Sequence, residues 1–290
     1  MNDTASSAGD KVVLRAMTDA DIPTAHALSR EAGWPHRAED WAFLFRVGHG
    51  VVACDGEDAV CGTAMWWPFG EAAGSVGMVI VPPKLQHRGI GRRLMQALAG
   101  QAESRSLRLT ATAAGYRLYE SGGFEAVGAI HQHQGTAMMP GERPSFEAGT
   151  VRPMRAEDHA AVVALDRAAF GADRARVFDQ LTGVADGLVC EREEGIVGFS
   201  FCRLFGRGRA IGPVVAADDA MAVALIHPHV VAQAGEFLRI DTAAAEGPFV
   251  DFLDASGLVR VGGGTVMVKG AAFSPSGSAR TYALVNQALG

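Results

Sequence analysis

The sequence of 290 residues predicts an α/β protein made of two copies of one fold, each a mixed, twisted sheet flanked by helices. Three observations lead to this fold class. Apolar runs typical of buried strands alternate along the whole chain with segments of helical spacing. A stretch rich in Gly, Pro, Ser and Glu interrupts that pattern near the middle. After it, landmarks of the first half return in the same order.

The first half predicts two helices between its first and second strands. A strand covers 12–15, and Thr18-Asp19-Ala20-Asp21 is a helix-start signal for a helix that runs to Glu31. Trp34-Pro35 ends that helix, and a second helix covers 38–47. Strands over 50–54 and 59–67 flank the turn at 55–58 as a hairpin.

The rest of the first half alternates strand and helix. An apolar strand over 76–81 leads through a short loop to a helix over 92–102, where Leu94 and Leu98 have helical spacing. A strand over 107–112, a helix over 114–121 and a closing strand over 124–130 follow. This order predicts one mixed sheet with helices on its faces.

Landmarks of the first half recur after residue 150. The separation of matched residues falls from 137 (152 − 15) to 134 (257 − 123) along the chain, as small deletions in a duplicated domain would give. The matched pairs are Arg15 and Arg152, Asp21 and Asp158, Cys54 and Cys190, Gly62 and Gly198, Val79 and Val214, and Gly123 and Gly257. We therefore expect a disordered lead over 1–10, a first domain over 11–135, a linker over 136–150 and a second domain over 151–290. The final segment, 278–289, has a helical pattern.

Composition narrows the class of protein. The net charge is −6 and the pI about 5.8, with the positive charge mostly on scattered Arg, which argues against a nucleic-acid surface. No run approaches ~20 apolar residues, so no membrane span is expected. The four cysteines lack metal or disulfide spacing and are expected to be buried, as in a cytoplasmic protein. His131 and His133 have no acidic or Cys partner nearby in the sequence, so we expect no metal site.

The most informative stretch is Gln86-His87-Arg88-Gly89-Ile90-Gly91, between the apolar strand and its helix. Glycine lets the backbone turn tightly and approach a ligand closely. A helix start supplies unpaired N–H groups and the positive end of the helix dipole. The stretch is therefore a candidate seat for phosphate oxygens.

Its full spacing, Val81-Pro82-x-x-x-Gln86-x-x-Gly89-x-Gly91, resembles the acetyl-CoA signature of the GCN5-related N-acetyltransferase (GNAT) family. A second stretch, Leu118-Tyr119-Glu120-Ser121-Gly122-Gly123-Phe124, is similar to another landmark of that family. The two together resemble a subgroup with a catalytic first GNAT domain and a degenerate second one. Residues 221–226, aligned with the loop by the repeat, contain no glycine.

The resemblance implies acetyl-CoA as the acyl donor. Backbone groups of the loop would hold the diphosphate, and the end of the preceding strand would bind the pantetheine arm. Thr112 stands where the family often has an Asn. The expected cofactor-binding residues are Val79, Ile80, Val81, Gln86, His87, Arg88, Gly89, Ile90, Gly91, Arg92 and Thr112.

Tyr119 is the expected general acid, because a phenol with an ordinary pKa of about 10 is protonated at neutral pH and can donate to a departing thiolate. The sequence does not identify the base, since 76–81 contains no carboxylate. Five residues are candidates for the substrate site, with core packing or a solvated charge as the alternative role of each: Glu31, Trp66, Glu71, Asp241 and Glu246.

The expected function is acetylation of a primary amine on a small metabolite, because a second domain leaning over the cleft would narrow access for a protein. Two alternatives stay open: acetylation of a protein N-terminus or lysine, and a non-catalytic acyl-CoA-binding regulatory module. The expected partner is a small-molecule amine, with neither nucleic acid nor membrane. Monomer and homodimer both remain possible.

Overall fold

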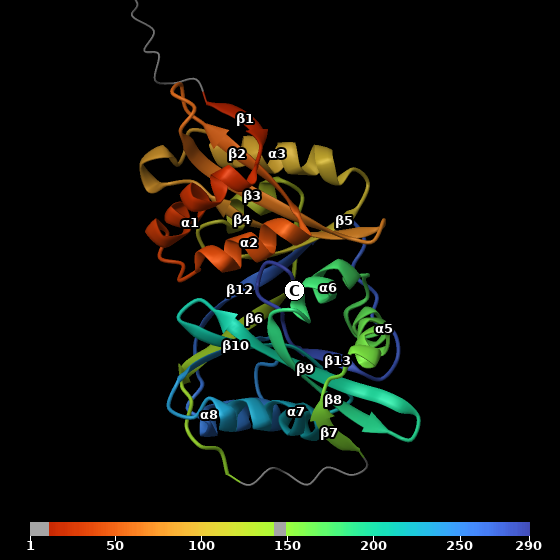
Figure 1. Ribbon diagram of the computed structural model, residues 1–290. Coiled ribbons are helices and arrows are strands. Elements are labelled where there is room, and N and C mark those ends of the chain that lie inside the picture. Colours follow the sequence, from red (N-terminus) through yellow and green to blue (C-terminus); the bar gives the residue numbers. More distant parts are fainter. Residues whose placement is uncertain (1–11, 142–148) are drawn as a thin grey trace, which may run out of the picture. The chain divides into compact units, whose positions relative to one another are not determined.

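The computed structural model describes residues 12–141 and 149–290, and these form two compact units (Figure 1). Unit 1 contains the chain up to Trp67 together with Val76–Glu103. Unit 2 contains Pro68–Ser75 and Ser104–Gly290. The expected lead over 1–10, and residues 142–148 of the expected linker, lie outside the described residues.

Unit 1 follows the predicted order of elements closely. Strands β1 and β2 pair antiparallel, and β2 pairs antiparallel with β3. Both helices between β1 and β2 turn apolar side chains inward, with Trp41 and Leu44 on the second one fully buried. The elements are β1 (Val13–Ala16), α1 (Ile22–Glu31), α2 (Ala38–Val47), β2 (His49–Cys54), β3 (Val60–Phe69), β4 (Ala73–Ile80) and α3 (Ile90–Ala102), and the unit boundaries fall within β3 and β4.

Unit 2 contains the end of the first sequence copy and all of the described second copy. Its elements are β5 (Ser106–Ala111), α4 (Tyr116–Ser121), β6 (Glu125–Thr136), β7 (Thr150–Pro153), α5 (His159–Phe170), α6 (Ala175–Leu181), β8 (Ala185–Arg192), β9 (Gly195–Phe205), β10 (Gly208–Ala216), α7 (Asp219–Ala232), β11 (Phe237–Thr242), α8 (Pro248–Ala255), β12 (Val259–Lys269) and β13 (Arg280–Ala283). The order of strands in its sheet is β5-β12-β6-β11-β10-β9-β8-β7, and β13 pairs with β10.

The two copies exchange their last strands within unit 2. β12, which closes the second copy, pairs with β5 of the first copy through Thr265–Lys269 and Leu107–Ala111. β6, which closes the first copy, pairs on its other edge with β11 of the second copy. Each copy therefore depends on the other to complete its sheet, as the adjacent β12 and β6 in Figure 1 illustrate.

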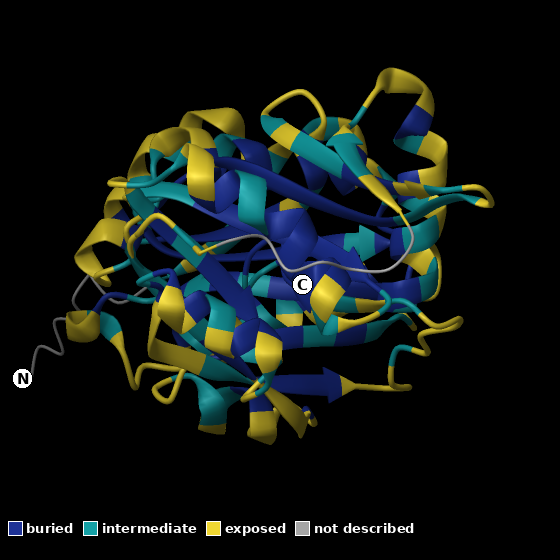
Figure 2. Ribbon diagram, turned by 90° about the horizontal axis from the view of Figure 1, so that it is seen from below, coloured by how far each residue is buried: buried dark blue, intermediate teal, exposed yellow. Residues whose placement is uncertain are grey.

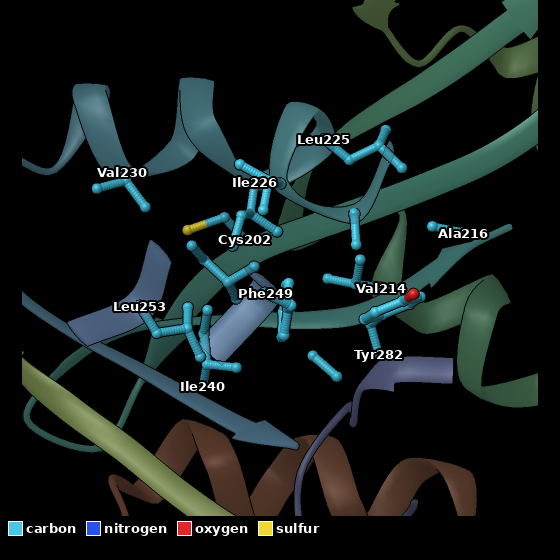
Figure 3. Packing of buried hydrophobic residues seen from close by; sticks show 14 of the residues in the cluster. Cys202, Val214, Ala216, Leu225, Ile226, Val230, Ile240, Phe249, Leu253 and Tyr282 are labelled. Atoms are coloured by element: carbon cyan, nitrogen blue, oxygen red, sulfur yellow. The ribbon is translucent and has the colours of Figure 1, made fainter. Parts of the chain in front are cut away.

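The core of the second copy lies between its sheet and the helices α7 and α8. α7 is apolar on all sides, and its residues from Met221 to Ile226 are buried, so this helix is enclosed rather than amphipathic. Figure 2 shows buried residues running along the central strands and exposed ones on turns and outer helix faces. Figure 3 shows side chains of α7, β10, β11 and α8 meeting in one cluster.

The sequence repeat is visible in the geometry of two ion pairs. Arg15 donates two hydrogen bonds of 2.8 Å to Asp21. Arg152 makes the same two-pronged contact with Asp158, at 2.7 and 2.9 Å. In each copy the carboxylate also accepts a backbone N–H and so caps the helical turn that follows the first strand.

The helix expected over 278–289 is wrong. Arg280–Ala283 form strand β13, antiparallel to β10, and a turn closed by Asn286 follows. Hydrogen bonds along β10 outweigh the local helical pattern, because pairing with a buried strand satisfies both backbones and buries Tyr282. Across the part of the chain that the structure describes, no helix is long and apolar enough to cross a membrane.

Candidate active site

The strand before the glycine-containing loop is irregular at Met78. This residue has φ +51°, which is rare for a side chain other than glycine, and its carbonyl accepts a hydrogen bond of 2.8 Å from Thr63 Oγ1. The distortion comes directly before Val79 and Ile80, whose main chain we expect to contact a ligand. A strand bent at this point has main-chain groups that are not committed to a regular ladder.

The loop itself, Val81–Gly89, is held by a side chain of its own. Gln86 Nε2 donates to the carbonyl of Val81 at 3.0 Å, which ties the middle of the loop to its start. Gly89, with φ +78°, is the N-cap of α3, and His87 also has positive φ. No side chain caps this helix. No capping side chain therefore accepts hydrogen bonds from the first N–H groups of α3.

A cavity of about 1000 Å³ lies beside the loop within unit 1. The loop and the start of α3 line one side of it with the cations Lys84, Arg88 and Arg93. Glu31, at the end of α1, lines it as well. Asp55 lines it too, so three cations face two carboxylates. This excess of positive charge and the uncapped start of α3 fit an anionic group such as the diphosphate of the expected cofactor.

Tyr119 lies in unit 2 on the short helix α4. It is 9% exposed, and its ring packs edge-on against Phe124 with the centroids 6.2 Å apart. Burial raises its pKa to about 12. Within the described residues no hydrogen bond engages the hydroxyl, so the phenol proton is not committed to a protein acceptor.

Thr112 lies just after β5 and organises the turn into α4. Its Oγ1 accepts the Gly115 N–H at 3.2 Å, and its carbonyl accepts from Gly115 and Tyr116. The residue is exposed, so the same hydroxyl is accessible from outside. Its position thus links the end of β5 to the helix that holds Tyr119.

The first-copy candidates for the substrate site differ in accessibility. Glu31 is exposed on the rim of the cavity in unit 1. Trp66 is buried, donates its ring N–H to Gln101 at 3.1 Å and packs against His49. Glu71 is exposed in the turn between β3 and β4. Of the three, Glu31 is therefore the one that lines this cavity.

Asp241, the main candidate from the second copy, is already paired. It is 4% exposed and accepts hydrogen bonds from Arg239 at 2.9 and 3.0 Å and from Gln287 at 2.8 Å. Because Arg239 balances its charge, a cationic amine would have to compete with that guanidinium. The alternation Arg239-x-Asp241 on one strand face is the sequence signal that could have revealed the pair. Glu246 is exposed in the loop before α8.

The counterpart of the loop in the second copy is a short connection. β10 ends at Ala216 and α7 begins at Asp219, so only Ala217 and Asp218 join them, where Val81–Gly89 join β4 to α3. Residues 221–226, which the repeat aligned with the loop, lie inside α7. Asp218 caps this helix by accepting the Met221 N–H at 2.8 Å. The helix start in the second copy is thus occupied by a carboxylate.

The cysteines and the paired histidines fill structural positions. All four cysteines are buried and free, and burial raises the pKa of each thiol. His133 contacts the carbonyl of Leu258 at 3.0 Å, and the Nδ1 of His131 is buried without a partner. No group of three or more His, Cys, Asp or Glu able to hold a metal ion occurs in residues 12–141 and 149–290.

Two family models described as acetyltransferase (GNAT) domain match the chain, one over residues 46–126 and the other over 162–283. An uncharacterized N-acetyltransferase of Bacillus subtilis, YitH, is 27% identical over 276 residues, which cover 91% of this chain and 93% of the relative. A putative acetyltransferase from Pyrococcus horikoshii has the same fold, with a TM-score of 0.79, 20% identity and 96% of each chain covered.

A tandem GNAT protein from the clavulanic acid biosynthesis pathway is also similar in fold, with a TM-score of 0.63 and 16% identity over 92% of this chain and all of the other. The fold, the loop and the matches to both halves define a two-domain acyltransferase. The chain belongs to the GNAT family and carries two of its domains.

Proposed function

We propose that this protein transfers an acetyl group from acetyl-CoA to a primary amine of a small metabolite, and that the first GNAT domain binds the donor. The single observation that carries the proposal is the difference between the two helix starts. α3 follows a nine-residue loop and has no side-chain cap, whereas α7 follows Ala217–Asp218 and is capped by Asp218. At this position of the repeat, the first copy therefore offers a helix start that can bind an anion, whereas the second copy has a carboxylate there.

In this proposal the loop and the strand end before it bind different parts of the donor. Backbone N–H groups from Gln86 to Arg92 hold the diphosphate, and the main chain of Val79–Val81 holds the pantetheine arm. Lys84, Arg88 and Arg93 add positive charge around the neighbouring cavity. The bond from Gln86 to Val81 pre-organises the loop, so little ordering is needed when the donor binds.

Tyr119 supplies the proton in the second half of the reaction. The donor brings an acyl thioester; the amine nitrogen forms a bond to its carbonyl carbon, and the carbon–sulfur bond breaks. The departing thiolate takes the phenol proton of Tyr119, the nitrogen loses one proton to water as the amide forms, and water returns a proton to the phenolate. Because burial raises the pKa of Tyr119 to about 12, the phenol keeps its proton throughout the physiological range.

The acceptor is proposed to be a primary amine that enters neutral or loses its proton to water, since Asp241 is bound to Arg239. A screen of amines with acetyl-CoA, in which released CoA is measured with a thiol reagent, tests the activity. Turnover with a small amine supports the proposal. Turnover with peptide N-termini or lysines alone would make the protein a protein acetyltransferase.

Binding of acetyl-CoA without turnover on any amine would instead support a regulatory module. The variant Gly91→Asp is the control for activity from another enzyme in the preparation. Gly91 is the second residue of α3, so a carboxylate there faces the diphosphate seat. The substitution should abolish donor binding and turnover together while the unfolding temperature stays within a few degrees of the parent protein.

A further inference from the structure

The second copy contains a fork between two parallel strands. β10 and β11 pair only over Arg209–Ile211 and Leu238–Ile240, and both continue beyond that point. In the first copy β4 and β5 likewise pair only over Ala73–Ser75 and Ser106–Arg108. The short parallel pairing is therefore common to both copies.

The carboxyl-terminal segment lies in the fork of the second copy. β13 pairs Ala283 with Val214 and Arg280 with Ala216. Leu284 then donates its N–H to the carbonyl of Asp241 on β11 at 2.9 Å. The segment is thus bonded to both arms of the fork.

The backbone of the segment approaches β10 very closely at Gly212. A Cβ at that position would lie 1.9 Å from the Leu284 carbonyl oxygen, and Gly212 has φ +149°. Any side chain there would collide with the segment. The fork is therefore shaped to the chain's own backbone.

Tyr282 anchors the segment in the core. It is almost fully buried and packs against Phe249 of α8 with ring centroids 5.1 Å apart, in the cluster that includes Val214 and Ile240 (Figure 3). Its hydroxyl donates to Asp219, the first residue of α7, at 2.6 Å. The strand therefore reaches across the fork to the start of the helix.

The helix start that it reaches is negatively charged. Asp219 also accepts hydrogen bonds from Arg280 at 2.8 Å and from the Phe249 N–H at 3.2 Å. Burial alone would raise the pKa of Asp219, but the bonds from Tyr282, Phe249 and Arg280 together lower it, so the carboxylate is ionised. With Asp218 beside it, this site repels a phosphate.

Beyond β13 the chain is tied to strands of both copies. Gln287 donates to Asp241 on β11 and to Gln132 on β6, at 2.8 and 3.3 Å. The carbonyl of Ala288 accepts a hydrogen bond from Ser75 Oγ. Ser75 is the last residue of β4 that pairs with β5, so the segment is also bonded to the paired part of these two strands.

We propose that Arg280–Gly290 is a strap that permanently fills the fork of the second copy and also holds the paired part of β4 and β5 at Ser75. The strap pairs with Val214–Ala216, the counterparts of the main chain of Val79–Val81 that is proposed to bind the pantetheine arm in the first copy, a comparison that rests on the function proposed above. The second domain is then closed to acyl-CoA by an internal occupant in addition to lacking a loop.

Hydrogen exchange on the full chain tests whether the strap is permanent. The amides of Tyr282, Ala283 and Leu284 should exchange as slowly as those of Val214–Ala216, both without acetyl-CoA and at saturation. Fast exchange, or an increase on adding acetyl-CoA, would overturn the proposal because it would mean that the strap leaves the fork. This readout does not depend on turnover, so it stands even if the proposed activity fails.

A disulfide across Val215 and Thr281, which face each other in the register, gives a second test. Thr281 Oγ1 is buried without a partner, so replacing it costs no hydrogen bond. In the variant Val215→Cys/Thr281→Cys, oxidation should change acetyl-CoA binding and turnover by less than about twofold. A loss of binding or turnover on oxidation would show that the strap must move, provided that a reductant reverses the loss and that the single variant Val215→Cys does not show it.

Discussion

The exchange of β6 and β12 predicts that the first half of the chain cannot fold properly without the second. Cutting the chain after Met139 removes β12, and β5 then loses its partner along Leu107–Ala111. β6 loses its partners on both edges at once, since β11 is removed as well. The fragment would expose three strand edges that the complete chain covers, one on β5 and two on β6.

The size of the loss follows from the buried side chains of β12. Val266, Met267 and Val268 are all buried, and burial of such a side chain contributes about 1.5–3 kcal/mol. Their removal costs about 5–9 kcal/mol, compared with a total stability of about 5–15 kcal/mol for a typical domain. We therefore expect fragment 1–139 to be insoluble, or to bind acetyl-CoA and acetylate poorly.

Soluble yield, far-UV circular dichroism and acetyl-CoA titration measure this outcome. The matched control is the same fragment extended by a Gly/Ser linker and residues 259–269, which restores the missing strand. We expect the extension to recover solubility. A fragment 1–139 that is soluble, unfolds cooperatively and has full activity would refute the reasoning, and the second domain would then be a spacer.

Four further predictions concern Tyr119, Asp158 and Arg174. Tyr119→Phe should lower kcat by ~10²-fold with donor affinity unchanged, and unchanged kcat would remove Tyr119 from the mechanism. Because the pKa of Tyr119 is raised to about 12, loss of its proton should not lower kcat below about pH 10. A fall of kcat between neutral pH and about pH 10 that is present in the parent protein and absent in Tyr119→Phe would contradict this. The hydrogen bonds from Arg152 lower the pKa of Asp158 to about 2. The contribution of this pair to the free energy of unfolding is therefore complete above about pH 4 and is lost as the pH falls toward 2. Asp158→Asn should make the stability of the chain less dependent on pH in that range. Arg174 is fully buried against Asp166, so Arg174→Met should destabilise the chain by about 3–5 kcal/mol in urea unfolding, and a neutral effect would show that the pair is dispensable.

Much of the fold could be predicted from the sequence because most elements have local signals. α2 was predicted with the bounds that the structure has, since Trp34-Pro35 and the apolar spacing mark both ends. The repeat was visible because paired residues such as Arg15 and Asp21 recur with Arg152 and Asp158. Such signals depend on neighbours within a few residues, and they report element type well.

Pairing between distant strands could not be predicted in the same way. Nothing in Val259–Lys269 or Glu125–Thr136 specifies locally that the two strands exchange places, because a half-buried strand has the same pattern beside either copy. The same limit explains the wrong helix at 278–289, where pairing with β10 decides the conformation. The repeat also aligned 221–226 with the loop, whereas the deletion lies before α7 and places these residues inside the helix.

Titration of the intact chain with acetyl-CoA tests the central claim most directly. The claim is that the first copy binds the donor while the second copy, with its short connection and its filled fork, does not. Isothermal calorimetry should give one acetyl-CoA per chain for the parent protein and none for Gly91→Asp. A stoichiometry of two, or one that survives Gly91→Asp, would place a donor in the second copy and contradict the account.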